Sequence, residues 1–151
     1  MNIADIEVAS LIPHAGEIVL LDRLETFTED SINAHTVVRD DGLFNNTPHQ
    51  VPSFIAIEYM AQAIAAWAGY RGKSLGQPVK IGLLLGTRDF KASVDYMPVG
   101  AKVQVRIQRI MEMANGMAVF DGWVTGDGIE ISGRLSVLSV ASLESLDSSL
   151  T

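Results

Sequence analysis

The alternation of hydrophobic and polar positions predicts a chain built mainly of strands around one long helix. A short helix is expected over residues 3–12, and an irregular loop over 40–52, where turn-forming residues are frequent. Strand patterns rich in Val, Ile, Leu and Thr cover 17–28, 32–39, 79–85, 89–96, 102–113, 117–125 and 129–140. Asn115-Gly116 and the Gly-Asp-Gly at 126–128 are typical of hairpin turns. The order of elements predicts an α+β fold, with helices on one side of an antiparallel meander.

The long helix has an unusual surface. It is expected to begin at Pro52-Ser53, with Ser53 near the cap, and to run to Tyr70. One apolar stripe consists of Phe54, Ile57, Ala61, Ile64 and Ala68, and further apolar residues cover most of the remaining surface. A helix that is apolar nearly all round must be buried nearly all round. The sequence therefore predicts a curved sheet of about six or seven strands wrapped around this helix.

The composition indicates one globular domain. Of 151 residues, 48% are hydrophobic and 19% are charged, which is enough apolar material for a core. We expect this domain over 1–140 and a loose tail, rich in Ser and Leu, over 141–151. The apolar stretch 51–69 approaches the length of a membrane span, but Glu58 and Gln62 within it favour a buried helix. The lack of cysteine and of a signal-peptide pattern at the N-terminus fits a cytoplasmic location.

The charge is unevenly distributed. The formal net charge of −7 argues against general nucleic-acid binding, which needs a cationic surface. Residues 71–109 nevertheless sum to +6, and the rest of the chain to −13. Two interpretations remain open at this point. The basic residues belong either to ordinary solvated faces or to a docking patch for an anionic partner.

Two polar side chains in the predicted helix are candidates for chemistry. Glu58 and Gln62 are spaced i, i+4, so they share one face and lie one turn apart. A carboxylate in an apolar helix is costly unless it is paired or used, and burial would raise its pKa into the range of general acid–base catalysis. The alternative is that Glu58 lies where the helix meets water or a subunit boundary, bonded simply to Gln62.

The three histidines show no metal-binding pattern. His14 and His35 are expected to be structural or surface residues, because one follows Pro13 and the other lies in an alternating strand. His49 lies in the loop before the helix, where it could face Glu58, although an ordinary loop residue is also consistent with the sequence. The chain lacks HExxH and phosphate-loop motifs and a G-x-S-x-G elbow, so we expect no bound metal and no serine nucleophile.

Three segments resemble the bacterial 3-hydroxyacyl-acyl-carrier-protein dehydratases. LIPHAGEIVLLDRL (11–24) resembles their opening motif, VPSFIAIEYMAQAIAAWAG (51–69) their central helix, and GTRDFKASVDYMPVG (86–100) a later strand pair. The helix is most similar to that of the dehydratase-like subgroup associated with aryl-polyene pigment synthesis. The resemblance implies a hotdog fold, a dimer with two composite sites and a substrate carried on the phosphopantetheine of acyl carrier protein, or on CoA, without a further cofactor.

The resemblance also implies roles for individual residues. The family's catalytic acid corresponds to Glu58, and its helix glutamine to Gln62. Its helix-start glycine, whose N–H polarises the thioester carbonyl, corresponds to Ser53, which keeps the N–H but makes close approach less free. Phe54 would supply the neighbouring N–H at the positive end of the helix. The family's catalytic histidine corresponds to Phe44, which cannot act as a base.

Arg88 and Lys91 lie in the matching strand motif, which makes them the first candidates for docking acyl carrier protein and the phosphate of its phosphopantetheine arm. Dehydration of a 3-hydroxyacyl thioester to the trans-2-enoyl thioester is the expected reaction. An acyl thioesterase with Glu58 orienting water and a non-catalytic hotdog subunit are the alternatives.

Two arrangements would supply the base that the family's catalytic histidine provides. Either His49 enters the site from a rearranged loop, or a second hotdog chain brings its own histidine against Glu58. We favour the second, a heterodimer, over a homodimer of this chain, because NNTPHQVP (45–52) shares neither the glycine nor the register of the family's histidine motif.

Overall fold

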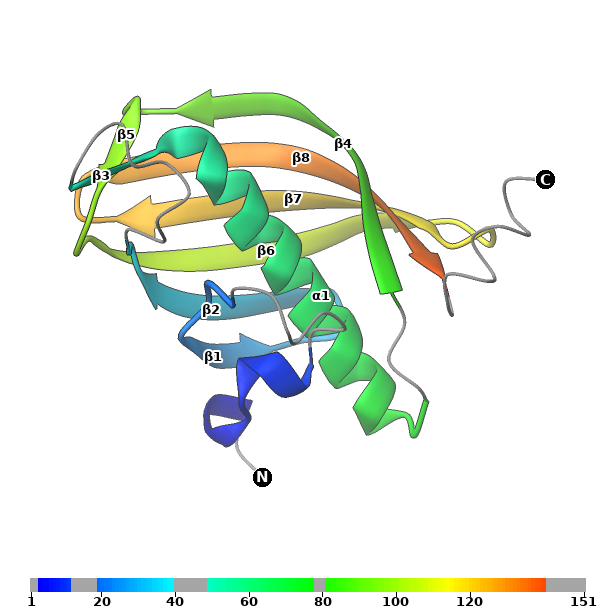
Figure 1. Ribbon diagram of the computed structural model, residues 1–151. Coiled ribbons are helices and arrows are strands. Elements are labelled where there is room, and N and C mark those ends of the chain that lie inside the picture. Colours follow the sequence, from blue (N-terminus) through cyan, green and yellow to red (C-terminus); the bar gives the residue numbers. More distant parts are fainter. Residues whose placement is uncertain (1–2, 12–18, 40–48, 78–80, 141–151) are drawn as a thin grey trace.

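The computed structural model describes residues 3–11, 19–39, 49–77 and 81–140. One helix, α1 (Ala56–Ser74), lies across one face of a six-stranded antiparallel sheet (Figure 1). The sheet has the order β1-β2-β6-β7-β8-β4, and its strands are β1 (Arg23–Phe27), β2 (Ser31–Val37), β4 (Ile81–Ala92), β6 (Lys102–Glu112), β7 (Met117–Gly126) and β8 (Ile129–Val140). This arrangement confirms the predicted α+β class and the hotdog architecture.

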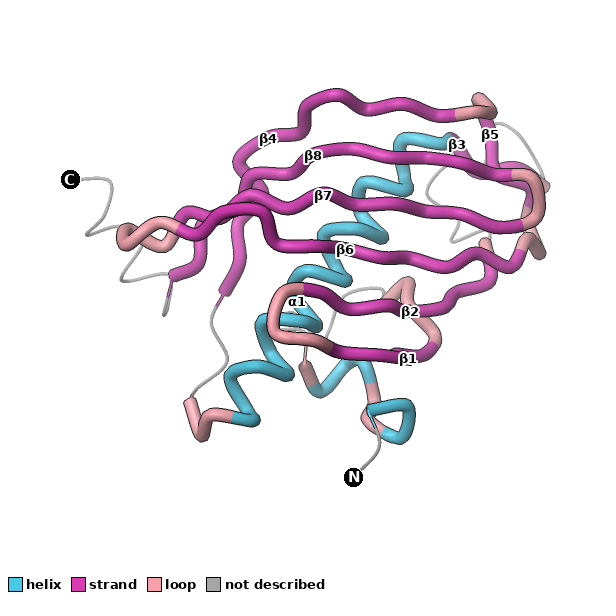
Figure 2. Tube along the Cα trace, turned by 180° about the vertical axis from the view of Figure 1, so that it is seen from behind, coloured by secondary structure: helices cyan, strands magenta, loops and turns pink. Residues whose placement is uncertain are grey.

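The other face of the sheet carries no helix in the described part of the chain, as the view from behind shows (Figure 2). A second, two-stranded sheet pairs β3 (Gln50–Pro52) with β5 (Tyr96–Pro98) at the start of the helix. A short 3-10 turn, η3 (Ser53–Ile55), leads from β3 into α1. The small sheet therefore fixes where the helix begins, and the sequence had indicated only an irregular loop up to residue 52.

Two predicted elements are wrong. The helix expected over 3–12 is a pair of 3-10 turns, η1 (Ile3–Asp5) and η2 (Val8–Ser10). Ile3, Val8 and Leu11 are buried in the core, and this packing, rather than the weak propensity of a short helix, sets the local conformation.

The first expected strand, 79–85, as far as the structure describes it, and the first half of the second, 89–96, belong to one continuous strand, β4, which ends at Ala92, while Tyr96 begins β5. Irregularities in the pairing of β4 with β8 lie between Leu84 and Gly86 and between Arg88 and Lys91, and Asp89 has a φ of 53°. Bulges absorb these turn-forming residues because β8 offers a partner along the whole length of β4.

The core forms between α1 and the sheet. Met60 packs so closely against β7 that a Cβ on Gly122 would lie 2.8 Å from its sulfur. Trp67 meets Phe120 edge-on, with ring centroids 5.4 Å apart, and its indole N–H donates to the Thr28 carbonyl at 3.2 Å. These contacts use one face of the helix, because side chains at i, i+3, i+4 and i+7 point the same way.

The sheet does not wrap the helix completely, which corrects the expectation of burial nearly all round. Phe54 is 52% exposed, Glu58 is exposed, and Ala61, Ala65 and Ala68 are only partly buried. Their spacing of four, three, four and three residues makes one continuous stripe, which we call the open face. An apolar face that the described residues leave uncovered is typical of a surface that another molecule covers. In the described part of the chain, no helix is long and apolar enough to cross a bilayer.

Candidate functional site

Glu58 lies on the open face, in the first turn of α1. Its Oε1 accepts a hydrogen bond from the Gln62 side-chain nitrogen at 3.4 Å. The burial expected for this carboxylate is absent within one chain, which agrees with the alternative that the helix here meets water or a subunit boundary. A partner surface would therefore have to supply any low-dielectric environment around Glu58.

Gln62 connects Glu58 to the rest of the fold. It is 8% exposed, and its Oε1 accepts the backbone N–H of Leu20 at 2.8 Å. The acceptor end of the amide is therefore fixed by the segment before β1, and its donor end points to Glu58. The structure therefore brings Gln62 and Glu58 together, as the sequence spacing of i, i+4 had indicated.

Ser53 does not act as the helix cap. Its hydroxyl donates to the Val94 carbonyl at 2.6 Å, and its backbone N–H donates to the Asp95 carbonyl at 2.9 Å. Both bonds attach the start of the helix to the turn after β4. The N–H of Ser53 is thus occupied in this structure, which corrects the expectation that it is open to a thioester carbonyl. Phe54 follows at the exposed start of the helix, beside the positive end of its dipole.

His49 is exposed and immediately precedes β3. Its φ is 68°, and its carbonyl accepts the Val99 N–H at 2.9 Å, so the backbone here is held in the left-handed region. Among the described residues, no hydrogen bond or ion pair joins His49 to Glu58. The structure therefore does not bring these two candidates together, and the role of His49 as a base stays a prediction.

The remaining histidines add nothing to the site. His35 lies on the outer face of the sheet, the face away from α1, and pairs with Glu25, as the surface interpretation predicted. His14 and Phe44 lie outside the described residues. Within the described ranges, no three His, Asp or Glu side chains come together as a metal site would require.

Arg88 and Lys91 are exposed but lie apart from Glu58. They pair with Arg134 and Ser132 of β8, whose side chains point to the outer face because Ile131, Gly133 and Leu135 are buried on the inner one. Lys91 lines a shallow outer hollow of about 240 Å³. The sheet therefore separates both cations from the open face.

The basic stretch 71–109 is divided between two faces rather than forming one patch. Arg109 pairs with Asp30 at 2.6 Å and with Glu112, and Arg71 lies 3.4 Å from Glu112, on the helix side. Arg106 lies over the Trp123 ring on the outer face, together with Arg88 and Lys91. The sequence could not show this division, because it depends on the strand register.

The geometry defines the class: a hotdog protein whose helix presents one oriented carboxylate on an uncovered face. A family model for the ApeP dehydratases, described as ApeP-like, matches residues 6–148. The chain therefore belongs to the ApeP dehydratase family, and it is a dehydratase-like hotdog subunit. No functionally curated protein matches its sequence at a significant level.

Solved structures show the same fold. A chain of the dehydratase heterocomplex ApeI:P from Xenorhabdus doucetiae is 24% identical, with a TM-score of 0.85, over 97% of this chain and 98% of that one. A hypothetical thioesterase from Streptococcus pneumoniae, solved with coenzyme A, is 12% identical, with a TM-score of 0.59, over 80% and 89%. A mutant of the phenylacetic acid degradation protein PaaI from Thermus thermophilus is 15% identical, with a TM-score of 0.55, over 78% and 91%.

Proposed function

We propose that this chain supplies the catalytic acid of a 3-hydroxyacyl-thioester dehydratase in aryl-polyene synthesis and needs a second hotdog chain to complete the site. The observation that carries the proposal is Glu58, a carboxylate oriented by a buried Gln62 and presented on an uncovered helix face. Membership of the ApeP dehydratase family favours dehydration over thioester hydrolysis.

The reaction has three requirements. A base removes the proton α to the thioester, an acid protonates the β-hydroxyl so that it leaves as water, and a donor stabilises the enolate oxygen. Glu58 provides the acid. In this proposal the thioester carbonyl lies at the positive end of the helix, where the dipole stabilises the enolate oxygen, rather than on the Ser53 amide, which already bonds to Asp95. The pantetheine thioester brings the substrate, so the chemistry needs no further cofactor.

The base comes from the partner in this proposal. Among the described residues His49 makes no bond to Glu58, and the position of the family histidine is Phe44. Two features of the chain support a hotdog partner. The edge strand β4 has described strands on one side alone and carries exposed Leu84 and Leu85, and the open face lies on the helix. The ApeI:P neighbour is itself a heterocomplex, which agrees with this arrangement.

The test is turnover of a 3-hydroxyacyl carrier protein, followed by mass spectrometry of the enoyl product. The chain alone should be inactive or very slow, and the complex with a second hotdog dehydratase that carries the family's histidine should be active. In that complex, Glu58→Gln should lower kcat by roughly 10²–10⁴-fold, because Gln cannot deliver the proton. Glu130→Gln, an exposed change on β8, is the matched control and should leave kcat unchanged.

Two outcomes would change the proposal. Full turnover by the complex that contains Glu58→Gln would make this chain a non-catalytic subunit. Brisk turnover by the chain alone that is lost in His49→Ala would place the base at His49 and remove the need for a partner histidine. Loss of the fold is checked by thermal melting, and Glu58→Asp provides a shorter carboxylate that keeps the acid.

Acyl carrier protein is the second proposed partner, with Arg88 and Lys91 as its contacts. Because both lie on the outer face, we expect the carrier to dock there and its arm to pass an edge of the sheet. Arg88→Glu with Lys91→Glu should raise KM for the carrier-bound substrate and weaken its salt dependence, without changing kcat. Lys73→Glu, on the exposed end of α1, is the control. An unchanged KM at low salt would reject this docking surface.

A further inference from the structure

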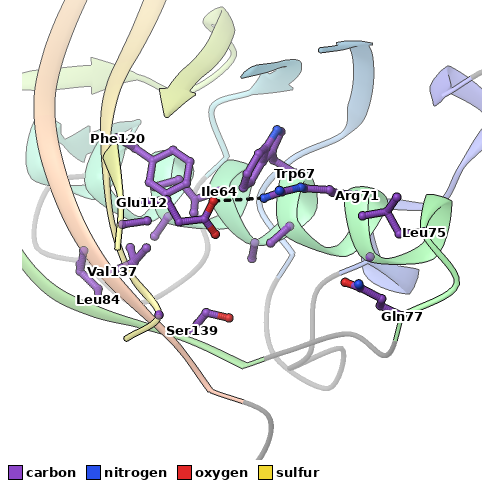
Figure 3. A pocket seen from close by; sticks show the side chains of 17 residues that line it. Ile64, Trp67, Arg71, Leu75, Gln77, Leu84, Glu112, Phe120, Val137 and Ser139 are labelled. Atoms are coloured by element: carbon purple, nitrogen blue, oxygen red, sulfur yellow. Dashed lines mark hydrogen bonds and ion pairs between the residues drawn. The ribbon is translucent and has the colours of Figure 1, made fainter. Parts of the chain in front are cut away.

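A cavity of about 270 Å³ lies between the C-terminal half of α1 and the sheet (Figure 3). The helix contributes the small side chains of Ala61, Ala65 and Ala68, and the sheet contributes Phe120 and Val137. Alanines facing a phenylalanine and a valine leave space that larger helix residues would fill. The cavity is thus a consequence of the small residues of the open face, and its walls are mainly apolar.

One wall of the cavity carries the Arg71 guanidinium beside the Glu112 carboxylate. Arg71 lies 5.3 Å from the Trp67 ring centroid, and its Nη1 is 3.4 Å from Glu112 Oε2. Figure 3 shows its head group turned towards Glu112. Within the described part of the chain, this is the ion pair that Arg71 makes, and it is long for a charge-assisted hydrogen bond.

Glu112 pairs more closely with Arg109 than with Arg71. The same Oε2 makes a much closer contact with Arg109, which also bonds Asp30 at 2.6 Å. Arg109 therefore has two carboxylate partners, Asp30 and Glu112. Among the described carboxylates, Arg71 has only the longer contact with Glu112, which it shares with Arg109. A guanidinium presents five N–H donors in a planar fork that suits a carboxylate, so Arg71 retains donors for an anion that enters from the cavity.

We propose that this cavity binds a medium-sized apolar monocarboxylate, with the carboxylate on Arg71 and the apolar body between α1 and the sheet. A dry cavity of roughly 150 Å³ can hold benzene, so about 270 Å³ has room for a short chain or a substituted ring. A cationic ligand is disfavoured because Glu112 is already paired. Ala61, at one end of the cavity, lies one turn from Glu58, whereas Arg71 lies about 20 Å along the helix axis from it. The carboxylate position is therefore distinct from the proposed acid, although the cavity begins beside it.

Octanoate is the probe, titrated into the full chain. The background variant Trp123→Phe leaves Trp67 as the sole tryptophan, because the sequence contains two. Trp67 lines the cavity, so its emission should change saturably as octanoate binds. Arg71→Gln should weaken binding at least about tenfold, because a hydrogen bond to a charged group is lost. Ala65→Leu should weaken it by filling space.

The controls decide between charge recognition and mere apolar filling. Arg106→Gln removes the same charge on the outer face and should leave octanoate binding unchanged. Arg71→Lys keeps the charge without the fork and should bind more weakly than wild type, which keeps the test valid if Arg71→Gln does not fold. Equal affinity for octanol and octanoate would show that the cavity takes an uncharged tail and overturn the carboxylate site. A titration without saturation would also overturn it.

Discussion

The two faces of α1 differ in what covers them. On the covered face, Tyr59, Met60 and Trp67 are at most 4% exposed and pack against the sheet. On the open face, Phe54 is 52% exposed, Glu58 is exposed and Ala65 is partly buried. Both faces are apolar in sequence, but the described strands pack closely against one, whereas the other is exposed at its start and borders a cavity further along the helix.

Because of this difference, substitutions on the two faces of α1 are expected to affect different properties of the protein. The covered face holds side chains whose volume is fitted to the sheet, so changes there act on folding. The open face carries Glu58, which accepts a hydrogen bond from Gln62, and under the proposed function changes there act on assembly and catalysis. Small residues are common to both faces, but for different reasons: on the covered face the backbone of another segment lies against them, and on the open face they leave space.

The largest effect on stability is expected at Gly69. A Cβ at this position would lie 2.2 Å from the backbone oxygen of Leu11, which cannot rotate away. Gly69→Ala should therefore lower the free energy of unfolding by about 3 kcal/mol. Gly82→Ala is the matched control, because nothing lies within 4 Å of a Cβ there. Urea unfolding measures both variants, and an equal cost would show that the helix does not need close approach to the N-terminal segment.

The same substitution on the two faces gives the most direct test of the comparison. Ala63 is fully buried, so Ala63→Leu should overpack the core and cost about 1–3 kcal/mol. Ala65→Leu places the same carbons on the open face and should change stability by less than about 0.5 kcal/mol. Thermal or urea unfolding of the isolated chain provides the measurement. A large loss for Ala65→Leu would mean that the open face is in fact filled within one chain.

The smallest expected effect on stability concerns Asp22, an exposed carboxylate that pairs with Arg39. Partial burial alone would raise the pKa of Asp22, but hydrogen bonds from Arg39 and the Val37 N–H, with the Arg39 charge, hold the pKa below its usual 3.8. A folded-state pKa that is depressed stabilises the protein above the unfolded value and loses this contribution as the pH falls through the folded one. Asp22→Asn should therefore cost about 0.5 kcal/mol at pH 7, because solvent screens the pair.

The stability cost of Asp22→Asn should shrink as the pH falls below 3.8, since the Asp22 carboxylate of the wild type then takes up a proton and loses its charge. Arg39→Gln removes the main partner and should show the same pH-dependent loss in urea unfolding. A cost for Asp22→Asn that is constant from pH 7 to pH 3 would contradict the assignment. It would indicate that the side chain acts through packing or neutral hydrogen bonds alone.

Local patterns predicted most of the elements because they depend on neighbouring residues. The strands of the C-terminal meander, β6 to β8, agree with the alternation to within one residue, since one face of each is buried. The division of β4 into two strands was wrong, because the chain passes the irregularities at Leu85 and Asp89 as bulges and stays paired with β8. The helix expected over 3–12 was wrong for a similar reason, namely packing against the core.

The candidate site likewise has features that local sequence predicted and features that depend on contacts between distant segments. The spacing of Glu58 and Gln62 indicated their contact, because an i, i+4 pair on a helix is a local geometry. Ser53 bonds to the Val94 and Asp95 carbonyls, which lie more than forty positions away. The sequence pattern did not predict these bonds. The placement of Arg88 and Lys91 on the outer face depends on strand register, which one residue of slip would reverse.

By itself, the sequence determined the long apolar helix, its single carboxylate with Gln62 one turn away, the antiparallel meander and the resemblance to dehydratases, because each depends on local spacing or on a contiguous motif. The tertiary structure alone decided which face of the helix is covered, how the basic residues divide between two sides of the sheet, and where Arg71 meets a cavity. Those properties arise from contacts between distant segments, and the burial of a residue is a property of what lies against it.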